Sequence, residues 1–201
     1  MSDLIRSRFL LVDDDEVIRR VMARIVRRQG EFVAAATFQR GVGLLRDGSP
    51  WTGFLFDVQL PDGSGLALLA QARATHPITP AIVLTGHNED AVVNAATDLR
   101  AHCVIKPITT ERIEHFLRDA TALDRRLERG LKDWVARYRL SEAEADLLRR
   151  AALGEDNSTI ATGRRTSQKT VKNQVKTLLA KTGDDSLLLT AARLLRDLAR
   201  A

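Results

Sequence analysis

Five short apolar runs, separated by segments with helical spacing, constrain this 201-residue chain more than any other feature. A short continuous apolar run is typical of a strand that is buried on both faces of a parallel sheet. Between the runs, apolar residues recur three and four positions apart, which indicates helices. The runs cover residues 9–12, 32–36, 54–56, 81–84 and 103–105. This alternation predicts a doubly wound (βα)5 parallel sheet with helices on both faces.

Polar residues follow four of these runs. Asp13 and Asp14 follow the first run, Asp57 the third, Thr85 the fourth and Lys106 the fifth. Because the carboxyl ends of parallel strands meet at one edge of a sheet, we expect these side chains to converge there. Loop ends are often polar, but that explains one or two such residues and not the whole set.

The residue types in this set point to phosphoryl chemistry. Clustered carboxylates repel one another unless a hard cation lies among them, and Mg²⁺ prefers oxygen ligands. A carboxylate beside Mg²⁺ can act as a nucleophile toward a phosphoryl group. The metal and an ammonium neutralise the charge on the phosphoryl oxygens, and a hydroxyl can bond to one of them.

The motifs around these residues resemble the receiver domain of two-component response regulators over about residues 6–119. They are Val12-Asp13-Asp14, Phe56-Asp57 followed by Leu60-Pro61-Asp62-Gly63, Leu84-Thr85-Gly86 and Ile105-Lys106-Pro107. The resemblance implies that Asp57 accepts the phosphoryl group, that Lys106 pairs with it and that Thr85 is the switch hydroxyl. It also implies a cis peptide between Lys106 and Pro107.

The resemblance also implies a Mg²⁺ site. Asp14, Asp57 and the backbone carbonyl of Gln59 would bind the ion directly, and Asp13 would act through bound water. We therefore expect Mg²⁺ as the cofactor, with Asp13, Asp14, Asp57 and Gln59 as the metal-site residues.

Position 103 departs from the receiver pattern. Receivers commonly have an aromatic residue three positions before the lysine, and its movement accompanies the switch, whereas this chain has Cys103. The departure leaves open a regulator whose receiver works independently of phosphorylation, although the complete acid, hydroxyl and lysine set argues against it. Because Cys103 is the only cysteine, internal disulfides and Cys-based zinc sites are excluded.

An apolar stripe between Ile113 and Tyr138 recurs at steps of three and four residues, which predicts a long connector helix. The alternative is two helices with a bend at Gly130, each packed on its own domain. We expect two exposed stripes to support a dimer. One is formed by the connector residues Leu123, Leu127, Leu131 and Trp134, and the other by Leu187, Leu188, Leu194 and Leu195 of the final helix. The predicted domains are residues 1–119, a helical linker at 120–137 and residues 138–201.

Positive charge is concentrated in the second half of the chain. Residues 1–119 hold 14 Lys and Arg against 15 Asp and Glu, for a net charge of −1. Residues 120–201 hold 17 against 11, for +6, and residues 164–181 contain six cations and no acid. A neutral half joined to a basic half indicates a polyanionic partner, by default a nucleic acid. The alternative is a solvated basic face.

The helical pattern of residues 138–201 predicts four helices, in which a short helix, a tight turn and a basic helix form a helix-turn-helix. The segment resembles the LuxR-type DNA-binding domain, and joined to a receiver it has the layout of NarL/FixJ-type response regulators. The matching residues are Gly154, Asn157, Ile160-Ala161, Ser167, Lys169-Thr170-Val171-Lys172-Asn173 and Leu178-Leu179-Ala180-Lys181-Thr182-Gly183. By motif position, Lys172, Asn173 and Lys176 would contact bases, and Lys169, Thr170 and Lys181 would contact phosphates.

These features predict a DNA-binding transcriptional regulator that is controlled by phosphorylation of Asp57 and is not an enzyme. The expected partners are a sensor histidine kinase, a double-stranded DNA operator, RNA polymerase and a second copy of the chain, at least when it is phosphorylated or DNA-bound. A metal-dependent phosphatase with an aspartyl nucleophile is the remaining alternative, but no general acid is placed near Asp57. With no apolar run of membrane-spanning length and no signal-peptide pattern, we expect a cytoplasmic protein without membrane contact.

Overall fold

The computed structural model describes residues 7–86 and 89–200 of the chain. Residues 1–6, part of the segment on which the expectation of no signal peptide depends, lie outside the described residues. The chain divides into two compact units, residues 1–74 with 78–122 and residues 75–77 with 123–201. Within the described ranges, no helix is long and apolar enough to cross a membrane.

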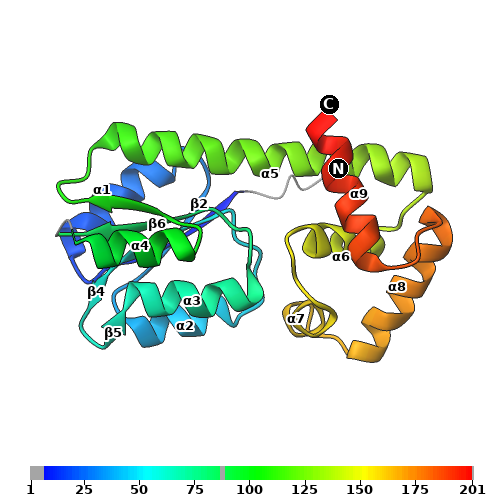
Figure 1. Ribbon diagram of the computed structural model, residues 1–201, viewed down its shortest axis with the longest axis horizontal. Coiled ribbons are helices and arrows are strands. Elements are labelled where there is room, and N and C mark those ends of the chain that lie inside the picture. Colours follow the sequence, from blue (N-terminus) through cyan, green and yellow to red (C-terminus); the bar gives the residue numbers. More distant parts are fainter. Residues whose placement is uncertain (1–6, 87–88, 201) are drawn as a thin grey trace. The chain divides into compact units, whose positions relative to one another are not determined.

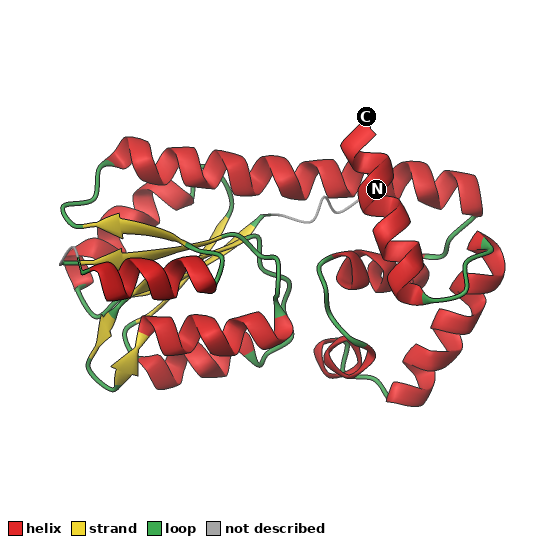
Figure 2. Cartoon of the chain, viewed as in Figure 1, coloured by secondary structure: helices red, strands yellow, loops and turns green. Residues whose placement is uncertain are grey.

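The first unit contains a five-stranded parallel sheet in the order β2-β1-β3-β6-β7, shown in Figures 1 and 2. Its strands are β1 (Arg8–Val12), β2 (Glu31–Ala35), β3 (Gly53–Asp57), β6 (Ala81–Thr85) and β7 (His102–Ile105). All four neighbouring pairs are parallel. The predicted doubly wound fold is thereby confirmed, with a small antiparallel pair, β4 (Gln59–Leu60) and β5 (Gly63–Ser64), between β3 and the next helix.

Helices cover both faces of this sheet. On one face, Leu10 and Val12 of β1 pack with α2 (Phe38–Leu45), α3 (Gly65–Thr75) and α4 (Asp90–Asp98). On the other face, Phe9 and Leu11 pack with α1 (Glu16–Val26) and the first part of α5 (Thr110–Tyr138). Alternate residues of one strand are thus buried on opposite faces, which is why the strands have continuous apolar runs instead of alternating ones.

The connector forms one continuous helix, α5, as the apolar stripe predicts, and there is no break at Gly130. A Cβ atom at Gly130 would lie 2.3 Å from a methyl carbon of Leu198 in α9 (Leu187–Arg200). Glycine at this position therefore allows two helices to pack closely, which offsets its poor helix propensity of ~1 kcal/mol.

The second unit packs its helices around the carboxyl-terminal part of α5. These helices are α6 (Glu142–Ala152), α7 (Asn157–Gly163), α8 (Gln168–Thr182) and α9. The predicted exposed dimer seam on α5 is wrong, because Leu127, Leu131 and Trp134 are only 3%, 5% and 3% exposed. They belong to the same core as residues of α6, α7, α8 and α9. Of the linker predicted at residues 120–137, residues 123–137 therefore belong to the second unit and residues 120–122 to the first.

Candidate functional site

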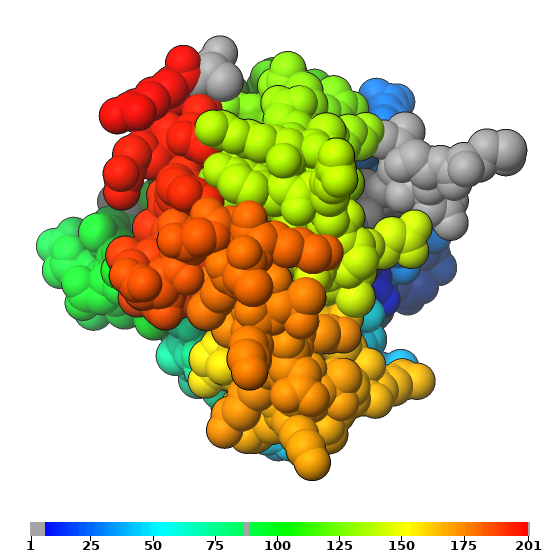
Figure 3. Space-filling model, turned by 90° about the vertical axis from the view of Figure 1, so that its right-hand side faces the viewer, coloured from blue at the N-terminus to red at the C-terminus, as the bar shows by residue number. Residues whose placement is uncertain are grey.

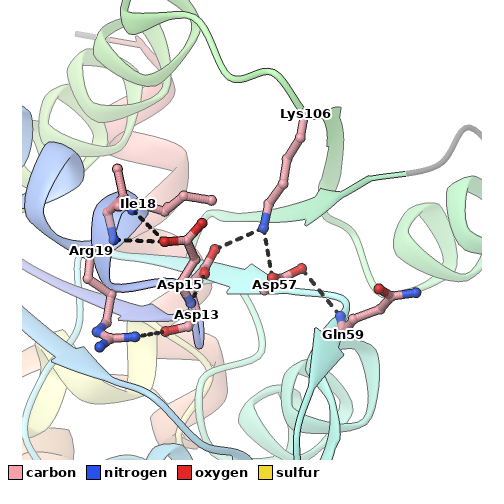
Figure 4. A network of polar contacts seen from close by, with 8 residues as sticks. Asp13, Asp15, Ile18, Arg19, Asp57, Gln59 and Lys106 are labelled. Carbon is pink, nitrogen blue, oxygen red and sulfur yellow. Dashed lines mark hydrogen bonds and ion pairs between the residues drawn. The ribbon is translucent and has the colours of Figure 1, made fainter.

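Strand ends bring the predicted acidic and basic side chains together at one edge of the sheet. Asp57 is the last residue of β3, Asp13 follows β1 and Lys106 follows β7. The Lys106 ammonium donates to Asp57 Oδ2 at 2.7 Å and to Asp13 Oδ2 at 3.2 Å, as Figure 4 shows. One lysine therefore bridges two carboxylates that are far apart in the sequence, as a parallel sheet permits.

Asp13 is fully buried and is held by its own loop. Its Oδ1 accepts a hydrogen bond from the Asp15 backbone N–H at 2.9 Å. Its backbone carbonyl accepts from the Arg19 guanidinium at 2.8 Å. Asp15 in turn caps the amino terminus of α1 through the N–H groups of Val17 and Ile18. The start of α1 thus fixes the direction of the Asp13 carboxylate.

Asp57 is 5% exposed and is the last residue of β3. Its Oδ1 accepts a hydrogen bond from the Gln59 backbone N–H at 3.3 Å. A Cβ atom at Gly65 would lie 1.9 Å from the Asp57 carbonyl oxygen, so the start of α3 approaches this residue at a distance that only glycine allows. The strand-end pattern did not predict Gly65 or Arg19, and both support the site by lying against the backbone carbonyls of Asp57 and Asp13.

The electrostatics of the site favour an added cation. Burial, together with the neighbouring Asp57 charge, raises the pKa of Asp13, although Lys106 and the Asp15 N–H oppose the shift. Burial by itself would lower the pKa of Lys106, but its hydrogen bonds to Asp57 and Asp13 and their charges outweigh burial and raise it. Asp14 adds a third carboxylate to the site. Lys106 balances one of the three negative charges, so two remain unbalanced.

Carboxylate oxygens of Asp13, Asp14 and Asp57 all lie within 4.8 Å of one another. Asp14 is exposed, whereas the other two are buried, so the cluster opens to solvent on one side. Oxygen donors at this spacing suit a hard divalent cation such as Mg²⁺. The donor set and the unbalanced charge therefore fit the predicted metal.

Thr85 is also at this edge. It is the last residue of β6, is 4% exposed, and its carbonyl accepts the Lys106 backbone N–H at 2.7 Å. The Lys106-Pro107 peptide bond is cis, as the resemblance implied. The structure thus places Asp13, Asp14, Asp57, Thr85 and Lys106 at the ends of four neighbouring strands.

The predicted nucleic-acid residues occupy α8 of the second unit, which Figure 3 shows in orange on the surface. All six, Lys169, Thr170, Lys172, Asn173, Lys176 and Lys181, are exposed. Lys181 differs, because its ammonium donates to Glu144 Oε2 at 2.6 Å and to the Arg139 carbonyl at 3.0 Å. The structure therefore brings all six residues onto one helix, and the ammonium of Lys181 alone among these lysines has partners within the unit among the described residues.

A comparison with known families decides the identity of the first unit. The model of the response regulator receiver domain matches residues 9–118. The chain belongs to the response regulator receiver family. The receiver unit is similar to a CheY-like receiver domain protein from Methanospirillum hungatei JF-1, with 27% identity and a TM-score of 0.53 over 57% of this chain and 96% of that one.

Among curated proteins, the receiver resembles the DNA-binding transcriptional regulator NtrC of Escherichia coli K12, at 38% identity over 42% of this chain. The match spans only 18% of the length of NtrC. The DNA-binding transcriptional activator DevR/DosR of Mycobacterium tuberculosis is 29% identical over 86% of this chain and 87% of its own length. Similarity to the second protein therefore extends over both units.

Position 103 of the receiver is occupied by a half-buried cysteine on β7. Cys103 packs against the core formed with α2, α3 and α4, and burial raises the pKa of its thiol. A thiol with a raised pKa is a poor nucleophile at neutral pH, so Cys103 acts as a small apolar side chain.

Proposed function

We propose that this chain is a response regulator that controls transcription by binding DNA after a partner histidine kinase has phosphorylated Asp57. The observation that carries the proposal is the bridge from Lys106 to Asp57 at the sheet edge, with Asp13, Asp14 and Thr85 beside it. The alternative that the polar strand ends are unrelated does not account for this convergence.

In the proposed reaction, an Asp57 carboxylate oxygen forms a bond to the phosphorus of a phosphohistidine. The bond between phosphorus and the donor nitrogen breaks, and the imidazole retains the electron pair. Lys106 lies within hydrogen-bond distance of the acceptor carboxylate and can follow the charge onto the phosphoryl oxygens. The buried Thr85 hydroxyl group is the proposed switch, because it can bond to a phosphoryl oxygen once the group has arrived.

Mg²⁺ is the proposed cofactor, with Asp14, Asp57 and the Gln59 carbonyl as direct ligands and Asp13 acting through water. When bound, the ion neutralises charge on the transferring group. The Asp13 carboxylate accepts hydrogen bonds from the Asp15 N–H and from Lys106 before any phosphoryl group arrives. The residues of the chain thus orient the acceptor and supply a charged surround in advance of transfer.

A partner that donates the phosphoryl group needs a surface next to Asp57. A groove of about 300 Å³ runs beside α1 and includes Lys106, Pro107 and Ile108. Val17 and Val21 line it and are 68% and 47% exposed, although both are apolar. We propose that the kinase side packs here, because an apolar contact beside Lys106 brings the donor to the acceptor.

DNA binding is proposed for the second unit. α7 and α8 are joined by a short turn, and α8 has exposed lysines at positions 169, 172 and 176, three and four residues apart. An α-helix with exposed Lys and Asn fits the major groove, where phosphate contacts give affinity and base contacts give specificity. Lys172, Asn173 and Lys176 are the proposed base-contacting residues, with Lys169 and Thr170 on phosphates.

A homodimer, at least when phosphorylated or DNA-bound, is proposed to form through α9. Leu188, Leu189 and Leu195 are 77%, 53% and 39% exposed on this helix. Leu194, predicted for the same exposed stripe, is fully buried in the core of the second unit and is excluded from the interface. Two copies would read two half-sites of a palindromic operator.

RNA polymerase is proposed as a further partner of the DNA-bound protein, and the proposed location is the cytoplasm.

Cys103 supports one second candidate, a DNA-binding regulator whose receiver acts without phosphorylation. In that case the side chain that couples Thr85 to the receiver surface is missing, and phosphoryl uptake would leave DNA affinity unchanged. The two functions differ in one measurable quantity, which is the change in DNA affinity on phosphorylation.

The test is phosphate incorporation from a small-molecule phosphodonor with Mg²⁺, followed by titration of duplex DNA. We expect one phosphoryl group per chain and tighter DNA binding in its presence. Uptake without any change in DNA affinity would favour the phosphorylation-independent regulator. Rapid turnover with release of phosphate would point to a phosphatase instead.

A further inference from the structure

The orientation of α8 depends on polar contacts as well as on its apolar side. Val171 and Leu178 are fully buried and form one stripe against the core of the second unit. The half-buried Val175 packs against the same core and Thr182 is 6% exposed, so α8 is anchored along one narrow stripe. Such a stripe fixes the position of a helix more firmly than its rotation about its own axis. The contacts at the flanks of the helix therefore determine which side chains it presents outward.

One such contact reaches the middle of α8 from the preceding turn. The Arg164 guanidinium donates to Gln174 Oε1 at 2.7 Å through Nη1. Its Nε lies 3.2 Å from Asp146 Oδ2 of α6. Arg164 thus joins three elements, which are α6, the turn after α7 and the centre of α8.

The acidic side of this contact is itself held in place. Asp146 also pairs with Arg150 at 3.4 Å, and Arg150 pairs with the buried Glu155 at 3.0 Å. The side chains of Arg150 and Glu155 are only 9% and 3% exposed. The chain of contacts therefore begins at the buried Glu155 and ends at Gln174 on α8.

Arg164 belongs to the run of six cations that suggests DNA binding, but its surroundings differ from those of its neighbours. Its side chain is 16% exposed and its charge is paired with Asp146. Arg165, Lys169, Lys172 and Lys176 are exposed, and no ion pair to them occurs among residues 7–86 and 89–200. Arg164 is therefore poorly placed to exchange counterions with a phosphate backbone.

We propose that Arg164 is a positioning residue for DNA recognition, which sets the roll of α8 through Gln174 and thereby determines base discrimination without touching DNA. The inference rests on the proposed DNA-binding function. Base readout tolerates errors of only about 0.5 Å in side-chain position, so a helix free to roll keeps its phosphate attraction and loses its sequence preference.

The experiment compares two duplexes with the full chain: one recovered from a random pool by the wild-type protein, and one scrambled. We expect Arg164→Gln to lower the affinity ratio of the two by about tenfold, within the range of one good base contact. The affinity for scrambled DNA and its salt dependence should stay unchanged. Arg164→Lys should fail to restore the ratio, because an ammonium lacks the planar fork that joins Asp146 to Gln174.

The matched control is Arg165→Gln, the exposed cation next along the chain. It should weaken both duplexes alike and lower the slope of log K against log salt by about 1. Gln174→Met tests the other end of the contact, because methionine has a side chain of similar length but lacks the amide oxygen that Arg164 bonds to. Alone it should reproduce the Arg164→Gln loss, and the double variant should be no worse than either single one.

The outcomes separate the inference from the function on which it rests. If Arg164→Gln behaves like Arg165→Gln, Arg164 is a phosphate contact and the inference is wrong. It is also wrong if the ratio is unchanged, or if the effects of the two substitutions add, since Gln174 would then read a base by itself. A wild-type chain that selects no sequence would overturn the proposed DNA-binding function, and the inference with it.

Discussion

The two candidate sites of this protein use charge in opposite ways. At the sheet edge of the receiver, Asp13 and Asp57 are buried and both pair with the same lysine, so their positions are fixed. On α8, the lysines at 169, 172 and 176 are exposed. A site for bond formation needs charges fixed in advance, whereas a surface for a polyanion needs charges that are available to exchange counterions.

The difference shows how a charge count along the sequence can mislead. Six cations lie in residues 164–181, and two of them, Arg164 and Lys181, are held by Asp146 and Glu144. The charges of these two are paired within the second unit, so we propose that they orient α8 and do not exchange counterions with DNA.

Replacing the acceptor should abolish phosphoryl uptake completely. Asp57→Asn keeps the shape of the side chain but removes the nucleophile, so labelling by a small phosphodonor should fall to background. Asp98→Asn is the control, because Asp98 is an exposed acid on α4, away from the strand ends. Labelling of Asp57→Asn at the wild-type level would remove Asp57 from the proposed role.

Leu127→Asp should lower the unfolding free energy of the second unit by about 3–5 kcal/mol, because the new carboxylate would be buried without a partner. Leu127 is 3% exposed, whereas Leu123 on the same helix is 41% exposed. Leu123→Asp should therefore cost less than about 1 kcal/mol. Urea unfolding followed by circular dichroism measures both variants. Equal stability of the two would mean that Leu127 is not part of the core.

Removing exposed cations of α8 should affect DNA binding in two distinct ways. Lys172→Ala and Lys176→Ala should each relax base preference by roughly 1–3 kcal/mol if they read bases. Lys169→Ala should weaken all duplexes alike and lower the salt slope by about 1. Titrations of selected and scrambled duplexes at several salt concentrations distinguish the two. Uniform weakening by Lys172→Ala would make it a phosphate contact.

Lys181 differs from Lys169 because its ammonium has hydrogen-bond partners within the second unit. It was predicted to contact phosphate, but its ammonium bonds to Glu144 and to the Arg139 carbonyl. We expect Lys181→Ala to leave the salt slope of DNA binding unchanged and to lower the unfolding free energy by about 1 kcal/mol. A drop in slope equal to that of Lys169→Ala would restore Lys181 to the DNA-contacting set.

The smallest expected effect is a pH dependence at Glu144. Burial would raise the pKa of Glu144, but bonds from Lys181 and Ser141 outweigh it and lower the pKa below 4.5. The ionised carboxylate therefore stabilises the fold above about pH 4.5, and this contribution disappears as the pH falls through the lowered pKa. Glu144→Gln should be less stable than wild type at pH 7, and the difference should shrink below about pH 4.5. A pH-independent difference would contradict this assignment.

Local patterns were sufficient for most of the fold. The apolar runs are strands because both faces of the sheet are covered, and β1 shows this with Phe9 and Leu11 on one side and Leu10 and Val12 on the other. A capping box of Ser141 and Glu144, three residues apart, also begins α6. These features depend on neighbours within a few positions of the chain, so the sequence is sufficient to predict them.

The sequence by itself determined the sheet and its helices, the polar residues at the strand ends and the basic character of residues 164–181. Only the tertiary structure decided which charges are available and which apolar stripes are covered. An apolar stripe on α5 predicts contact with some surface, and the helices of the same unit provide it at Leu127, Leu131 and Trp134. Likewise, the six cations of residues 164–181 have the same formal charge, but the acids that engage two of them come from α6, which is distant along the chain. Coulombic pairing depends on distance in space, which the order of residues along the chain does not contain.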